Sequence, residues 1–218
     1  MSAPGPSPAG PAAAPRVKIC GLTRLEDALA AVALGADALG FNFWPGSKRF
    51  IAPAEARRIV RALPPLVTTV GVFVDPAHDE AVAAAAVSGV QVLQLHGDEP
   101  PELCRSFQLP VVKALRVAGP ESLEALDRYA GVAGFLLDAA SPGYGGSGRT
   151  FDWSIARAAA ARATVLLAGG LHPGNVAEAV RAVRPWAVDV ASGVEAAPGV
   201  KDHELMARFI RAAKEQQA

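Results

Sequence analysis

Two short, glycine-rich turns near the end of the chain contain residue types that bind phosphate groups. Gly169 and Gly170 follow one apolar run, and Ser192 and Gly193 follow the next. A glycine lets the backbone approach an anion closely, and a following helix N-terminus adds a favourable dipole. In barrels of eight strand–helix units, the loops after strands seven and eight form such a site. The pair predicts a phosphorylated small-molecule ligand, although either turn alone also fits a tight strand–helix connection.

Five further side chains lie at or just after the expected carboxyl ends of strands, where barrel enzymes place their functional groups. They are Cys20, Arg49, His96, Asp138 and Asp189. The cysteine and the aspartates are candidates for proton transfer, and arginine pairs bidentately with a carboxylate. Each also has a structural interpretation, because a cysteine fills space, an aspartate caps a loop and an arginine is usually solvated. His96 fits substrate contact or a hydrogen bond that closes its strand. Asp189 fits substrate orientation or the holding of loops.

Composition limits the class of protein. The chain has 218 residues, 51% of them hydrophobic, with 21 basic and 21 acidic side chains. This size suits one large domain or two small ones. Without a basic stripe we expect no nucleic-acid partner, and no apolar run reaches the length of a membrane-spanning helix. The two cysteines and four histidines show no metal-ligand spacing, so we expect no metal, reduced thiols and a cytoplasmic location.

The elements that must position these residues alternate along the chain from Arg16 onward. Short, continuous apolar runs are typical of strands buried on both faces, and alanine-rich segments between them favour helices. Eight such units of roughly 25 residues predict a single-domain (β/α)8 TIM barrel over residues 16–218. The alternative is an open doubly wound sheet, but no G-x-G-x-x-G follows the first strand. We expect a cap at Thr23 for the first helix.

The expected strands are Val17–Cys20, Ala38–Phe43, Leu66–Val74, Val90–Leu95, Val111–Leu115, Gly134–Asp138, Thr164–Ala168 and Ala187–Val190. The expected helices are Arg24–Leu34, Ala54–Leu63 opened by Pro53, Pro76–Ser88, Glu99–Phe107, Glu121–Tyr129, Asp152–Arg162, Pro173–Arg184 and Asp202–Lys214. Residues 1–15 hold proline, alanine, glycine and serine with no charged side chain. We expect them to be a flexible extension, because this composition suits neither a signal peptide nor a helix.

Seven ordered groups of segments resemble the phosphoribosylanthranilate isomerase family. They are Val17–Thr23; Gly40–Phe43 with Ser47–Phe50; Gly71–Val74; Gln94–Glu99; Leu136–Asp138 with Gly145–Trp153; Leu167–Leu171; and Val188–Glu195 with Pro198–Asp202. The resemblance implies a (β/α)8 barrel that rearranges N-(5-phosphoribosyl)anthranilate into its 1-deoxyribulose isomer in tryptophan biosynthesis. It also implies that Cys20 is the general base, that Asp138 is the general acid and that Arg49 holds the anthranilate carboxylate.

The chemistry of an Amadori rearrangement suits these residue types. An acid protonates the ring oxygen so that the furanose opens to an iminium, and a base removes the proton on C2. No cofactor is expected, because the iminium itself accepts the electron pair. Asp138 must keep a proton, although a free aspartate titrates at about 3.9, and Cys20 must lose one, although a free cysteine titrates at about 8.5. Lys18, two residues before Cys20 on the same strand face, is expected to favour the thiolate.

Two alternative functions follow from the same residues. One is a dual-substrate sugar isomerase of histidine and tryptophan synthesis, although the chain shows no second glycine-rich pair in its first half. The other is a non-catalytic barrel that binds a phosphorylated ligand. The segment Gly143–Gly148 is predicted to be a mobile lid, with an idle flexible loop as its alternative. A monomer is expected, with a homodimer as the alternative.

Overall fold

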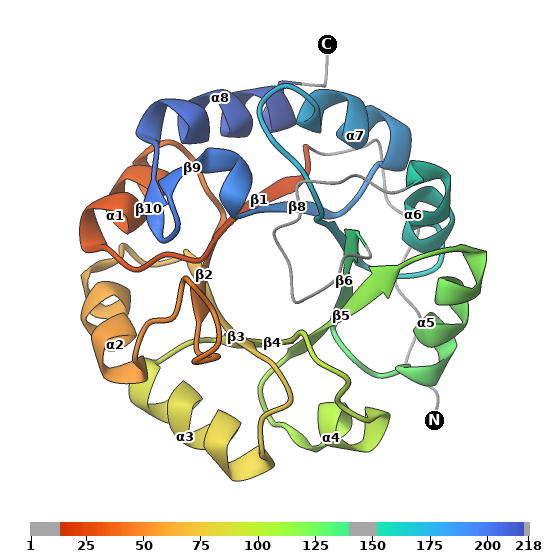
Figure 1. The fold of residues 1–218 in the computed structure, drawn as a ribbon, viewed down its shortest axis with the longest axis horizontal. Coiled ribbons are helices and arrows are strands. Elements are labelled where there is room, and N and C mark those ends of the chain that lie inside the picture. The colour runs from red at the N-terminus through yellow and green to blue at the C-terminus, as the bar shows by residue number, and fades with distance from the viewer. Residues whose placement is uncertain (1–13, 140–151, 216–218) are drawn as a thin grey trace.

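The computed structural model describes residues 14–139 and 152–215, so most of the expected extension and the expected lid at Gly143–Gly148 lie outside the described residues. Eight parallel strands form a closed barrel in sequence order, and β1 pairs with β8 to complete it. Figure 1 shows the barrel end-on, with the helices in a ring around it. The predicted TIM barrel is confirmed. The strands are β1 Arg16–Cys20, β2 Ala38–Asn42, β3 Thr68–Phe73, β4 Val92–Leu95, β5 Val111–Val117, β6 Gly134–Ala139, β7 Val165–Leu167 and β8 Ala187–Val190.

Eight α-helices of the described chain cover the outside of the barrel. They are α1 Leu25–Ala33, α2 Pro53–Ala62, α3 His78–Ser88, α4 Pro101–Ser106, α5 Glu124–Arg128, α6 Trp153–Ala160, α7 Val176–Val183 and α8 His203–Lys214. Their apolar faces pack on the outward side chains of the strands in one large buried cluster. This packing holds the strands in a fixed register, so that residues at their carboxyl ends meet across the barrel.

The inside of the barrel holds a second, smaller apolar cluster. Its residues alternate along the strands with those of the outer cluster, as the period of two in a strand requires. They are Val112, Ala114, Leu136, Leu166, Ala168 and Ala187, with Val92 packed beside them. On the same inward faces lie buried polar side chains, among them Lys18, Gln94 and Asp189. The interior therefore has apolar filling together with a polar zone.

Several predicted boundaries are wrong at the starts of helices. Thr23 does not cap α1, because the residue before the helix is Arg24; the Thr23 hydroxyl donates to the carbonyl of Gly199 at 2.6 Å. Asp152 does cap α6 by accepting from the backbone N–H of Ser154. The helix expected from Pro173 begins only at Val176. The expected helix Glu121–Tyr129 is divided into a 3-10 turn, Pro120–Leu123, and α5.

An antiparallel hairpin between β8 and α8 was not expected from the sequence. After a short 3-10 turn, η2 Ser192–Val194, the chain forms β9 Glu195–Ala197 and β10 Val200–Lys201. Gly199 turns the hairpin with a φ of +80°, a left-handed conformation that favours glycine. The hairpin lies beside α1 and α8 in Figure 1 and carries two charged residues, Glu195 and Lys201, of which Glu195 accepts from Arg49. Among the described residues, no helix is long and apolar enough to cross a membrane.

Candidate active site

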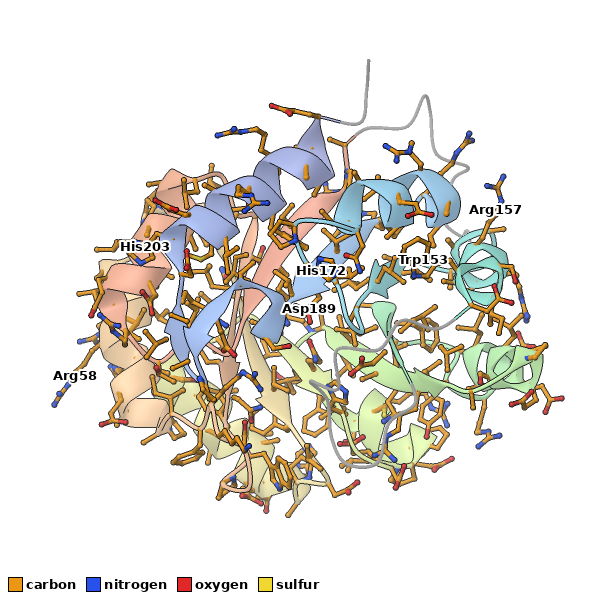
Figure 2. All side chains as sticks on the ribbon, turned by 45° about the horizontal axis from the view of Figure 1, so that its top comes forward. Arg58, Trp153, Arg157, His172, Asp189 and His203 are labelled. Atoms are coloured by element: carbon orange, nitrogen blue, oxygen red, sulfur yellow. The ribbon has the colours of Figure 1, made fainter. Side chains whose placement is uncertain are left out.

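A pocket opens at the carboxyl ends of the strands. Cys20, Arg49, His96, Asp138 and Asp189 line it, although these residues come from five different strand–loop units. Gly169, Gly170 and Ser192 line it as well. Figure 2 shows Asp189 among the side chains inside the barrel, whereas Arg58 and Arg157 project outward from the surrounding helices. The described residues contain no group of three or more His, Cys, Asp or Glu side chains that could hold a metal ion.

Cys20 lies at the end of β1, buried beside Lys18 on the inward face of the same strand. Gly40 on β2 makes room for both, since a Cβ there would come within 2.7 Å of the Cys20 sulfur and 3.1 Å of the Lys18 ammonium. Burial raises the pKa of the Cys20 thiol, and the charge of Asp189 adds to this rise. Lys18 acts in the expected direction by lowering the pKa, but burial outweighs it. Burial therefore favours the thiol form of Cys20, and the Lys18 ammonium favours the thiolate.

A chain of polar contacts crosses the barrel from the Cys20 side to the Asp138 side. The Lys18 ammonium donates to Asp189 Oδ1 at 2.8 Å and to Gln94 Oε1 at 3.0 Å. Burial lowers the pKa of Lys18, but the charge and hydrogen bond of Asp189 outweigh burial and leave it raised. Gln94 Nε2 lies 3.2 Å from His96 Nδ1, and His96 Nε2 lies 3.4 Å from Asp138 Oδ2.

This series of polar contacts determines the tautomer of His96. The Gln94 oxygen already accepts from an ammonium, so its amide nitrogen faces the imidazole. An amide nitrogen only donates, and His96 Nδ1 must then accept. The ring proton consequently lies on Nε2, which faces the Asp138 carboxyl. The sequence left two roles open for His96. In the structure, its side chain lines the pocket and also contacts Asp138, the expected acid.

Arg49 extends from the loop after β2 across the mouth of the pocket. Its Nε and Nη2 donate to the two oxygens of Glu195 at 2.8 and 2.7 Å. The aliphatic part of the side chain lies against Gly21, where a Cβ would approach Arg49 Cδ to 2.4 Å. Gly21 also has a φ of +75°, so both its backbone and its surroundings favour glycine. The hydrogen bond to Glu195 raises the pKa of the guanidinium, which remains charged at every physiological pH.

The two glycine-rich turns lie next to each other at the same mouth. Gly169 and Gly170 have φ values of +80° and +66°, in the left-handed region. Asn175 fixes this turn by donating to the Gly170 carbonyl at 2.9 Å. Gly193 packs so closely on the first turn that a Cβ would lie 2.0 Å from the carbonyl oxygen of Leu171. Gly193 does not itself line the pocket, and its close packing on Leu171 brings the two loops together.

Comparisons with known proteins agree with this geometry. The sequence profile described as N-(5'-phosphoribosyl)anthranilate (PRA) isomerase matches residues 17–212. The chain belongs to the phosphoribosylanthranilate isomerase family. A curated relative from Myxococcus xanthus, an N-(5'-phosphoribosyl)anthranilate isomerase, is 55% identical over 203 residues, covering 91% of this chain and 96% of the relative.

Solved structures of this family share the fold. That of the Thermotoga maritima isomerase is 49% identical with a TM-score of 0.88, and covers 92% of this chain and 98% of that one. Another isomerase, solved in complex with reduced 1-(o-carboxyphenylamino)-1-deoxyribulose 5-phosphate, is 46% identical with a TM-score of 0.84 and the same coverage. A further Thermotoga maritima structure, of monomers generated from a dimeric isomerase, is 45% identical with a TM-score of 0.83 and again covers 92% and 98%. The family resemblance found in the sequence is confirmed.

Sequence reasoning missed several polar residues of this family member's site. Gln94 on β4 lies two residues before His96, which directly follows the strand, so the period of two in a strand predicts both on one face and was a signal for Gln94. Trp44 and Ser47, from the loop that carries Arg49, also line the pocket. Glu195 and Lys201 lie within the segments that resembled the family, but their contacts to the site depend on the hairpin, which no sequence pattern indicated.

Proposed function

We propose that this pocket rearranges N-(5-phosphoribosyl)anthranilate to 1-(2-carboxyphenylamino)-1-deoxyribulose 5-phosphate, the isomerisation by which the family serves tryptophan biosynthesis. The observation that carries the proposal is the position of Cys20 and Asp138, which face one pocket from β1 and β6. A thiol and a carboxyl on different walls of one cavity are suited to proton transfers at two separate atoms of a bound sugar. Arg49 and the two glycine-rich turns lie at the mouth of the same pocket.

In the proposed first step, Asp138 gives its proton to the ring oxygen of the ribose. The bond between C1 and that oxygen breaks, and the lone pair of the anthranilate nitrogen forms an iminium with C1. The hydrogen-bond chain supports this role, because His96 Nε2–H faces the carboxyl group that is proposed to protonate the substrate. The carboxyl must be protonated when the substrate binds.

In the second step, the Cys20 thiolate removes the proton from C2. The electron pair of that bond moves into the iminium and forms an enolamine. Protonation at C1 and loss of the proton from the C2 hydroxyl then give the ketone. The proton taken by Cys20 replaces the one given by Asp138, so the cycle is balanced and needs no redox partner. The Lys18 ammonium beside Cys20 supports the thiolate while burial opposes it.

The substrate has two anionic ends, and the pocket offers two matching regions. We assign the phosphate to the loops at Gly169–Gly170 and Ser192–Gly193, where glycines permit close backbone approach. The carboxylate of the anthranilate ring is assigned to Arg49, whose planar fork suits bidentate pairing. Asp189 is assigned a positioning role, because its carboxylate accepts from Lys18 on the neighbouring strand.

Turnover is tested by the loss of anthranilate-type fluorescence when substrate is added. Cys20→Ser and Asp138→Asn should each lower kcat by about 10²–10⁴-fold with little change in KM. Cys104→Ser is the matched control, because Cys104 is a buried packing residue of α4 and should leave kcat unchanged. Ligand binding without turnover in the wild-type protein would instead favour the non-catalytic barrel. Near-normal turnover of Asp138→Asn would refute the acid assignment.

The monomer expected from the sequence stays a prediction. The Thermotoga maritima relative described as dimeric keeps a homodimer as its alternative. Sedimentation equilibrium of the full chain over a range of concentrations decides between them. A single species at the mass of one chain, 22.4 kDa, supports the monomer, and twice that mass refutes it.

A further inference from the structure

The hairpin formed by β9 and β10 carries a pair of charged side chains next to Arg49. We propose that Glu195 and Lys201 are positioning residues that set the specificity of the site for a carboxylated aromatic amine, acting through Arg49. Neither residue is among the pocket-lining side chains. This inference rests on the proposed function, because it takes Arg49 as the group that binds the substrate carboxylate.

The contacts fix the direction of the guanidinium. Glu195 accepts from Arg49 Nε and Nη2 in a bidentate pair, and the Lys201 ammonium donates to Glu195 Oε1 at 2.8 Å. The backbone N–H of Gly199 donates to the same oxygen at 3.2 Å, and Lys201 also donates to the Ala191 carbonyl at 3.2 Å. The side chains of Lys201 and Glu195 are 0% and 6% exposed, whereas that of Arg49 is 20% exposed. The buried pair therefore holds one edge of a guanidinium that stays accessible.

A guanidinium has more than one edge that can pair with a carboxylate. Glu195 uses the edge formed by Nε and Nη2. Nη1 makes no hydrogen bond to any residue in the described ranges 14–139 and 152–215, and the remaining proton of Nη2 points away from Nε. The edge formed by Nη1 and Nη2 is thus available to a second carboxylate. Because Glu195 holds the adjacent edge, the guanidinium is fixed in one orientation, which lowers the entropy lost when a carboxylate binds the free edge.

The charges of the three residues explain why the lysine is needed. Arg49 and Glu195 alone would form a neutral pair, and a neutral pair attracts an added carboxylate only weakly. Lys201 contributes an ammonium group; burial lowers its pKa, and the charge and hydrogen bond of Glu195 oppose that fall. With all three groups ionised, the cluster carries a single positive charge that matches the single negative charge of an anthranilate carboxylate. Burial raises the pKa of Glu195, but the hydrogen bond from Arg49 and the charge of Lys201 outweigh it, so the carboxylate stays ionised.

The experiment measures binding of two stable ligands, the reduced product analogue and its counterpart that lacks only the ortho carboxylate. The measured quantity is the ratio of their dissociation constants in each variant. Lys201→Met should reduce the preference for the carboxylated ligand by about tenfold, the order expected for a hydrogen bond to a charged group, while affinity for the other ligand stays within about twofold. Lys214→Met is the matched control, because that lysine pairs with Asp37 at the outside of α8 and should leave the ratio unchanged.

Glu195→Gln distinguishes an effect of the orientation of the Arg49 guanidinium from an effect of the net charge of the site. This variant makes the site more positive, but its amide nitrogen would face a donor of Arg49 and could not hold the fork. We expect the carboxylate preference to fall by about tenfold in this variant too. A preference that rises with the added positive charge would show that charge alone matters and would overturn the positioning role. If Lys201→Met does not fold, Lys201→Gln keeps a donor toward Glu195 without the charge and should show the same loss.

Arg49→Met distinguishes failure of this inference from failure of the proposed function. If Arg49→Met leaves the ratio unchanged, the carboxylate does not bind at Arg49, and the assignment made under the proposed function is wrong. If Arg49→Met abolishes the preference while the variants of Glu195 and Lys201 keep it, the positioning role alone is wrong. If variants at all three positions lose the preference and still bind the ligand that lacks the carboxylate, both the carboxylate assignment and the positioning role are supported.

Discussion

A further buried ion pair, outside the pocket, allows a quantitative prediction about stability. Lys113 on β5 and Glu99 are 2% and 0% exposed in their side chains, and their charged atoms lie 2.6 Å apart. The ammonium also donates to the carbonyl of Gly97 at 2.6 Å. The Glu99 carboxylate accepts from the backbone N–H groups of Asp75 and Gly97, and the Tyr129 hydroxyl donates to the Glu99 carbonyl. The pair therefore fixes the loops after β3 and β4, next to His96.

Lys113→Met removes the ammonium and leaves the carboxylate buried without its counter-charge. Breaking a buried pair from one side typically lowers the free energy of unfolding by about 3–5 kcal/mol. A chain of this length loses about 2–4 °C in Tm for each kcal/mol, so we expect Tm to fall by about 6–20 °C. Differential scanning calorimetry measures this, and urea unfolding gives an independent value. Combining Lys113→Met with Glu99→Gln should recover part of the loss, because the second change removes the unpaired charge.

The control is an exposed pair of similar geometry. Arg162 and Asp127 lie 2.9 Å apart, but their side chains are 43% and 80% exposed. Water already solvates both groups, so Arg162→Met should change the free energy of unfolding by no more than about 1 kcal/mol. If Lys113→Met cost no more than the exposed control, or if adding Glu99→Gln made it worse, the interpretation of the buried pair as an interdependent unit would be wrong.

Two further predictions concern the pocket. Because burial raises the pKa of Cys20, the rate of its alkylation by iodoacetamide should increase only at a pH above the ordinary thiol range. Lys18→Met should move this increase to still higher pH, and Asp189→Asn should move it to lower pH. Equal shifts of the alkylation profile in both variants would refute the electrostatic assignment. Gln94→Leu removes the donor that holds the tautomer of His96 facing Asp138, so kcat should fall by about fivefold with KM nearly unchanged, whereas a change in KM alone would refute the positioning role.

The sequence was sufficient to predict the barrel because its strand signals are local and repeated. Each strand is a short apolar run, and β8 was predicted with its observed bounds, Ala187–Val190. The errors occur where tertiary contacts replace local ones. Thr23 has the residue type of a helix cap, but α1 begins after Arg24, and the Thr23 hydroxyl donates to a carbonyl 176 residues away in the sequence. The hairpin of β9 and β10 is too short to produce an alternating pattern that could be detected.

The sequence indicated candidate residues at the ends of strands, but it did not indicate the contacts between them. The rule that barrels carry function at the carboxyl ends of strands selected Cys20, His96 and Asp138, and all three line one pocket. Nothing in the sequence indicated which of them would contact which. Arg49 and Glu195 are 146 residues apart, and only the position of the hairpin brings them together. The partner of a charged side chain in a loop is set by the fold of another loop, which local patterns do not encode.

Barrel closure nevertheless makes one of these connections accessible to reasoning. Once β8 is taken to pair with β1, the parallel register places Asp189 directly opposite Lys18, as the structure has it. Both lie on inward faces, and a buried ammonium in an apolar strand requires an anion within reach. A lysine and an aspartate at matching register on the first and last strands therefore identify each other as partners. Cys20 follows Lys18 by two residues on the same face. The pairing therefore also places Lys18 and Asp189 near the Cys20 thiol, whose pKa they shift in opposite directions.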